Sequence, residues 1–205
     1  MIEVLLSFSL ATIVLALSPG PDNIYVLTQS LAHGSKSGIA TTAGLISGCI
    51  VHTALLAFGI SALITASEFV FYGIKCVGAA YLLYLAYKVF RAPATISFTE
   101  NTTQKKSAWA YFKIGVIMNL VNPKVMLFFI AFFPAFLWNP ESNTILQFFV
   151  LGGVFMVVSF IVFSSIALLA GFISNYLKAN SRVGLVLKWM QILVFVGIAV
   201  YILIP

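Results

Sequence analysis

Long apolar segments dominate this chain, and each is long enough to form a helix that crosses a lipid bilayer. About 20 helical residues span the roughly 30 Å hydrocarbon core of a membrane. Six segments reach that length, at roughly residues 4–31, 39–64, 70–90, 112–138, 144–170 and 184–204. This pattern predicts an all-α membrane protein with six transmembrane helices. The connections are expected at residues 34–38, 65–68, 91–111, 138–143 and 177–184.

The composition excludes an ordinary soluble domain. Hydrophobic residues make up 61% of the 205 positions and charged residues only 8%, whereas soluble domains carry about 25% charged residues. A soluble fold of this length has too small a core to bury so much apolar surface. Residues 4–17 are not expected to be a cleavable signal peptide, because no basic residue precedes them and Ser18-Pro19-Gly20 is a poor cleavage site.

The basic residues predict the orientation of the chain, because loops on the cytoplasmic side carry an excess of Lys and Arg. If the N-terminus lies outside, the outer side receives Glu3, Glu68 and Glu141, with Lys75 near it. The inner side then receives Lys36, Lys88, Arg91, Lys105, Lys106, Lys113, Lys178, Arg182 and Lys188. An even number of spans places both termini outside. The net charge of +6 therefore reflects topology, and no nucleic-acid partner is predicted.

Two proline motifs interrupt the apolar segments. Ser18-Pro19-Gly20-Pro21-Asp22-Asn23 lies in the first segment and Asn122-Pro123-Lys124 in the fourth. Proline removes a backbone donor and clashes with the preceding turn, so we expect helix breaks at Pro19, Gly20, Pro21 and Pro123. A broken helix persists in a bilayer only where its freed polar groups line a cavity or contact protein. Paired breaks in two halves of a chain indicate the binding site of a transporter.

The breaks divide one transmembrane domain, residues 1–205, into two similar halves. Repeat 1 covers about residues 1–90, a cytoplasmic linker about 91–111, and repeat 2 about 112–205. Because each half has three spans, the second enters the membrane from the opposite side, and the repeats are inverted. Pro21-Asp22 then corresponds to Pro123-Lys124, which predicts that the Asp22 and Lys124 side chains lie within about 6 Å of each other or share one cavity near the midplane.

Asp22 and Lys124 are the leading candidates for binding substrate and protons. A carboxylate buried in a membrane is costly, and such groups mark proton relays and substrate paths. Asp22 is therefore a candidate proton carrier, although an acid after a break also caps the next half-helix. Lys124, beside a half-helix N-terminus, would attract an anionic group. The alternative for Lys124 is a structural salt bridge to Asp22.

Other polar residues carry weaker signals. Asn23, Asn119 and Asn122 flank the breaks and either satisfy unwound backbone or touch a substrate. His52 falls near the middle of the second span and is either a hydrogen-bonded packing residue or a relay. Lys75 is explained by snorkelling to the outer surface or by a role at the outer mouth.

The sequence lacks the motifs of several chemistries. It has no phosphate-binding glycine loop, no zinc-protease or serine-hydrolase motif and no His/Cys cluster. We therefore predict no metal, no cofactor and no enzymatic activity. Cys49 and Cys76 are interpreted as small core residues. Gly44 and Gly48 form a small-xxx-small pair that is typical of close helix packing.

These motifs resemble the LysE/RhtB family of bacterial amino-acid exporters, of the homoserine/threonine-resistance type. The resemblance covers nearly the whole chain, and the residues that carry it are Ser18–Asn23, Ser30–Gly34, Gly44 with Gly48 and His52, Lys75 with Gly78–Leu82, and Asn119–Lys124. It implies export of amino acids or their derivatives across the bacterial inner membrane, driven by the proton gradient. It also implies that Pro19 to Asp22 and Asn122 to Lys124 are characteristic positions.

Alternative functions remain at this stage. A membrane channel or another small-solute carrier would also suit an apolar helical chain. A thiol–disulfide electron carrier is disfavoured, because it requires a cysteine in the first helix of each repeat, where this chain has Asp22 and Lys124. The sequence leaves open which amino acid is carried, the coupling stoichiometry and whether the chain forms a homodimer.

Overall fold

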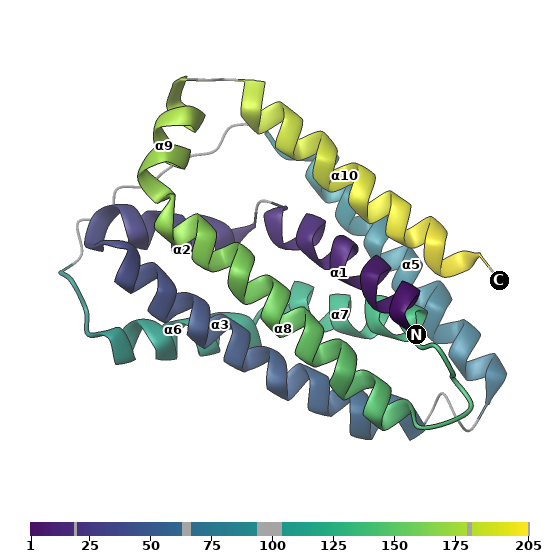
Figure 1. Ribbon diagram of the computed structural model, residues 1–205. Helices are drawn as coiled ribbons and strands as arrows, with labels where there is room; N and C mark the ends of the chain where they lie inside the picture. Colours follow the sequence, from purple (N-terminus) through teal and green to yellow (C-terminus); the bar gives the residue numbers. More distant parts are fainter. Residues whose placement is uncertain (19, 63–66, 94–103, 180–181, 205) are drawn as a thin grey trace.

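The computed structural model describes residues 1–18, 20–62, 67–93, 104–179 and 182–204, and every element within these ranges is a helix (Figure 1). In chain order the α-helices are α1 (Ile2–Leu17), α2 (Pro21–His33), α3 (Ser35–Leu55), α5 (Glu68–Arg91), α6 (Ala108–Leu120), α7 (Pro123–Phe132), α8 (Thr144–Leu168), α9 (Ala170–Ala179) and α10 (Arg182–Leu203). A π-helical turn, η1 (Leu56–Ile60), extends α3, and a 3-10 turn, η2 (Phe133–Phe136), extends α7.

Four helices in the described residues are long and apolar enough to cross a membrane, and their apolar stretches are Ser35–Ile60, Phe69–Arg91, Thr144–Leu168 and Val183–Leu203. The number rises to five if α1 and α2, which meet at a bend of 61°, count as one broken span. The fourth expected span, 112–138, for which a break at Pro123 was expected, consists of two helices. Because Pro123 cannot donate a backbone hydrogen bond, α6 and α7 are separate helices of 13 and 10 residues, each shorter than a span.

Two connections differ from the sequence-based expectation. The expected loop at 34–38 is reduced to one non-helical residue, Gly34, whose φ of 90° is rarely adopted by residues with a side chain. The Gly34 amide donates to the Ser30 carbonyl, so α2 ends and α3 begins with almost no intervening chain. The linker 91–111 is also shorter than expected, because α6 begins at Ala108 behind a Ser107 cap. Its residues 94–103 lie outside the described part of the chain.

Helix α9 was not predicted. It follows directly after α8 and occupies most of the region between the expected span 144–170 and the next one. Phe172 and Tyr176 are exposed on it, and their rings stack in nearly parallel planes, 9° apart. Residues four apart lie on one face of a helix, so α9 carries an aromatic face that the sequence pattern had not indicated.

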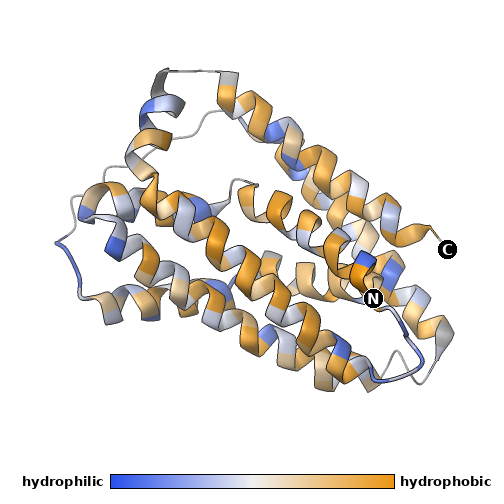
Figure 2. Cartoon of the chain, viewed as in Figure 1, coloured by the Kyte–Doolittle hydropathy of each residue, from blue (hydrophilic) through white to orange (hydrophobic). Residues whose placement is uncertain are grey.

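The helices pack around α3, which contacts α6, α8 and α2. A second layer is the pair α5 and α10, and α7 joins the layers by packing against α5. Both chain ends lie at the same end of the molecule (Figure 1). Figure 2 shows hydrophobic residues along the outer faces of α8 and α10 and hydrophilic ones mainly near helix ends and connections. This distribution suits a bundle surrounded by lipid.

Glycines allow the closest of these contacts. A Cβ atom at Gly44 in α3 would collide with the carbonyl oxygen of Phe112 in α6, and one at Gly115 in α6 would collide with the carbonyl oxygen of Thr41. The two helix backbones therefore touch directly, as small residues permit in membrane bundles.

Phenylalanines fill the region between the chain ends and the middle of the bundle. The Phe8 ring in α1 lies 5.1, 5.3 and 5.2 Å from the rings of Phe132, Phe133 and Phe136. All four side chains are almost completely buried. This cluster joins α1 to the end of α7 and to η2.

Candidate functional site

A cavity of about 100 Å³ lies where the two proline motifs meet α3 and α8. A single buried water needs only about 10–15 Å³ of such space, so this cavity has room for a small solute. Its walls come from α1, α2, α3, α6, α7 and α8. Segments that are far apart in the sequence therefore build one site.

Four helix ends meet at this cavity. α1 ends at Leu17 and α6 at Leu120, whereas α2 begins at Pro21 and α7 at Pro123. Helix C-termini carry partial negative charge and N-termini partial positive charge. Ser18, Gly20 and Asn122, which lie in the interruptions, all line the cavity. The site therefore offers both signs of charge to one bound molecule, which suits a solute that is itself positive at one end and negative at the other.

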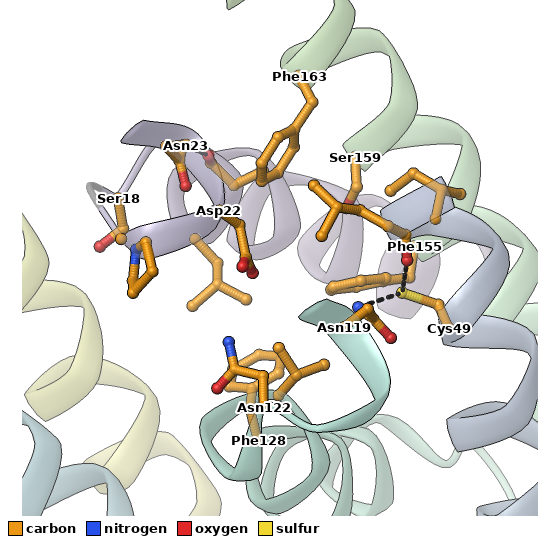
Figure 3. A pocket seen from close by; sticks show the side chains of 17 residues that line it. Ser18, Asp22, Asn23, Cys49, Asn119, Asn122, Phe128, Phe155, Ser159 and Phe163 are labelled. Carbon is orange, nitrogen blue, oxygen red and sulfur yellow. Dashed lines mark hydrogen bonds between the residues drawn. The ribbon is translucent and has the colours of Figure 1, made fainter. Parts of the chain in front are cut away.

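Asp22 and Asn23 enter the site from the first turn of α2. The Asp22 carboxylate points into the cavity (Figure 3) and is partly exposed there. The side-chain amide of Asn23 donates to the carbonyl oxygen of Ala16 over 2.7 Å. This carbonyl belongs to the last turn of α1, where no following helical residue is present to donate to it. Asn23 therefore bridges the break and fixes how α2 leaves α1.

Asn119 and Asn122 have different surroundings although both flank the second break. The Asn119 amide nitrogen donates to the Cys49 sulfur over 3.5 Å, and a Cβ atom at Gly48 would collide with its side chain. Asn119 thus fits α6 against α3. The Asn122 side chain instead points into the cavity from the side opposite Asp22 (Figure 3), while its backbone oxygen accepts from the Val125 amide at the start of α7.

His52 lies behind the cavity wall and is not part of its lining. It is 4% exposed, its Nε2 atom is 3.4 Å from the Asn119 carbonyl oxygen, and its ring lies 5.4 Å from that of Phe129. The His52 ring therefore contacts α6 and α7. Lys75 is likewise separate from the cavity, with its ammonium group 5.6 Å from the ring centres of Phe71 and Tyr72.

Some predicted residues cannot be placed. Pro19 lies outside the described residues, and so do the side chains of Pro123 and Lys124, although both residues belong to the backbone of α7. The predicted approach of Asp22 to Lys124 therefore stays a prediction.

The sequence analysis missed the α3 and α8 walls of the site. Cys49 in α3 and Phe155, Ser159 and Phe163 in α8 all line the cavity. The three α8 residues are spaced by four, so they form one stripe on the helix. The available signal was Ser159, a polar residue in the middle of a strongly apolar span.

The family model described as LysE type translocator matches residues 13–205. The chain belongs to this family. The resemblance inferred from the two proline motifs is thus confirmed, and the family is one of translocators and not of enzymes.

Two relatives of this translocator are informative. It is 34% identical over 176 residues to a homoserine/homoserine lactone efflux protein of Salmonella typhimurium, covering 86% of this chain and 84% of the relative. It is 31% identical over 193 residues to a leucine efflux protein of Salmonella choleraesuis, covering 94% and 91%. No solved structure matches.

Proposed function

We propose that this translocator exports amino acids or their small derivatives across the bacterial inner membrane, and that the proton gradient drives export. Relatives named as homoserine and leucine efflux proteins support the solute class. The observation that carries the proposal is the cavity at which two helices end and two begin, beside the Asp22 carboxylate.

The zwitterionic part of an amino acid binds between the two breaks. Its ammonium group faces Asp22 and the carbonyl ends of α1 and α6, where the partial charge is negative. Its carboxylate faces the N-terminal end of α7, with Lys124 as the proposed cationic partner and Asn122 as a hydrogen-bond donor. Binding thus uses charges that the helix breaks place around the cavity.

Proton coupling acts through Asp22. Protonation from the outside removes its charge, weakens its hold on the ammonium group and releases the solute outward. Loss of the proton to the inside restores the site. Both termini lie outside in this scheme, and the basic residues of the connections support that orientation. The location of both chain ends at one end of the bundle supports a shared side for the termini (Figure 1).

Two inverted three-helix repeats, with α1–α2, α3 and α5 in one and α6–α7, α8 and α10 in the other, provide the alternation of access. The packing supports this division. In this division, α3 of the first repeat corresponds to α8 of the second, and α1 corresponds to α6. The contact of α3 with α6 then corresponds to that of α8 with α1, and both are present.

Counterflow in liposomes tests the proposal. Vesicles that contain the purified protein and excess unlabelled amino acid are diluted into a trace of labelled amino acid. A carrier accumulates label transiently, because unlabelled solute leaving the vesicle returns the site to the outside. A channel only equilibrates the label, so simple equilibration, or no uptake of any amino acid, would refute the proposal.

A further inference from the structure

We propose that the cavity selects neutral amino acids with apolar side chains and excludes lysine and arginine, an inference that rests on the proposed function. Two features of the cavity support this selectivity: its acidic lining and the wall formed by α3, α7 and α8.

Asp22 is the one acidic residue that lines the cavity among the side chains that the structure describes. The chain has five acidic residues. Glu3 and Glu68 lie at the starts of α1 and α5, Glu141 lies in the connection before α8, and Glu100 lies in the linker. Among the described side chains, Glu3 and Glu141 do not line the cavity. Glu100 and the Glu68 side chain lie outside the described part of the chain. Once Asp22 has paired with the α-ammonium group, a second cation on the solute meets no other carboxylate among the described lining residues. Unpaired charge at such depth is strongly disfavoured.

The wall formed by α3, α7 and α8 is predominantly apolar. Its hydrophobic members are Leu45, Ile46, Val125, Phe128, Phe155 and Phe163. Pockets lined in this way bind apolar groups, because the solute exchanges water for apolar contact. An amino acid whose charged end is held at the breaks would place its side chain against this wall. A leucine or methionine side chain gains from that transfer, whereas an ammonium group loses its hydration.

Ser159 is the position in this wall that bears most directly on selectivity. It lies four residues from both Phe155 and Phe163 on the cavity side of α8 (Figure 3). Its side chain is 2% exposed, and its hydroxyl has no hydrogen-bond partner among the described residues. A carboxylate at this position would be the missing partner for a second cation. Ser159 is therefore inferred to be a specificity-determining residue.

The first test compares solutes with the unmodified protein. Vesicles are loaded with leucine, methionine, homoserine, lysine or arginine, and the uptake of labelled leucine by counterflow is measured. Leucine and methionine should drive uptake at least tenfold faster than lysine or arginine. Lysine equal to leucine, or homoserine better than leucine, would overturn the assigned class while leaving amino-acid transport intact. Failure of every amino acid would instead refute the proposed function.

The second test creates the missing charge. Ser159→Asp should increase counterflow of labelled lysine at least tenfold over the unmodified protein, whereas Ser159→Asn, which has the same shape without the charge, should not. Ile46→Glu, with Ile46→Gln as its control, repeats the test at a half-buried position in the α3 part of the same wall. Each variant is first checked for a monodisperse elution profile. Folded Asp and Glu variants without lysine transport would overturn the inference.

Discussion

At the scale of single residues, the two positions that follow the first break have separate tasks. Asn23 holds the interrupted backbone through Ala16, and Asp22 faces the cavity. The sequence placed both beside the break but could not divide the tasks, because an acid or an amide after a proline serves equally well as a cap or as a ligand. Only the direction of each side chain separates them. The same holds for Asn119 and Asn122 at the second break.

Asp22→Asn should abolish the response of export to a pH gradient. The substitution keeps the shape of the side chain but removes the group that carries the proton. Efflux from vesicles is measured with and without an imposed gradient, and the variant is expected to give the same rate in both. Glu141→Gln, which removes an exposed acid outside the cavity, serves as the control. A variant at Asp22 that still responds to the gradient would exclude its role in coupling.

Asn23→Ala should destabilise the fold by about 1–3 kcal/mol, because the Ala16 carbonyl loses its donor in a partly buried setting. Thermal unfolding in detergent measures the effect as a lower Tm. Asn175→Ala makes the same change at an exposed position on α9 and should leave Tm nearly unchanged. Equal Tm values for the two variants would contradict a bridging role for Asn23.

At the scale of helices, the positions where two helix backbones touch determine which side chains the bundle can accommodate. The small-xxx-small pair in α3 indicated a close approach, and the structure identifies the partner as α6. The partner was not predictable, because any helix with a small residue at the crossing would satisfy the pattern. α9 was not predicted, because its residues can be recognised as a separate helix with an aromatic face only once α8 is known to end at Leu168.

Gly44→Ala should separate α3 from α6 and lower Tm, because the new methyl group collides with backbone that cannot rotate away. The matched control is Gly153→Ala in α8, where a Cβ atom meets nothing within 4 Å. Alanine is favoured over glycine in a helix by about 0.5–1 kcal/mol, so this variant should be unchanged or slightly more stable. Tm values in the reverse order would refute the contact.

Phe8→Ala should open a path from the outside to the cavity, because Phe8 contacts three rings that belong to α7 and η2. Cys49 lines the cavity and is a natural reporter. In a Cys76→Ser background, a membrane-impermeant maleimide added outside should label Cys49 several-fold faster in the variant than in the parent protein. Phe172→Ala, an exposed ring on α9, is the control. Equal labelling rates would show that the cluster does not seal this side.

At the scale of the whole molecule, the helical membrane class followed from apolar length alone, and four of the expected spans correspond to long apolar helices. The continuity of each span as one helix was not predictable from apolar length. Residues 112–138 are predominantly apolar, and Pro123 divides them into helices too short to cross separately. Hydropathy reports the affinity of a segment for lipid and not its continuity as a helix.

The orientation of the molecule can be measured directly. Alkaline phosphatase fused after Pro205 should be active, because both termini are expected outside, where the enzyme folds. A fusion near Thr103 should be inactive, because the linker is expected inside. The opposite pattern would overturn the orientation and with it the inverted relation of the two repeats.

The contact of α7 with α5 has no counterpart of similar extent between α2 and α10 among the described residues. At the α5–α7 contact, a Cβ atom at Gly78 would collide with Ala131. A Cβ atom at Gly197 in α10 would meet no atom within 4 Å. The two proposed repeats thus have unequal shapes. If the repeats exchanged conformations, α2 would pack against α10 while α7 separated from α5. Access would then change to the opposite side of the membrane, and every helix would stay intact. Under the proposed transport mechanism, this asymmetric arrangement would be one of two access states, and the arrangement with the repeats exchanged would be the other.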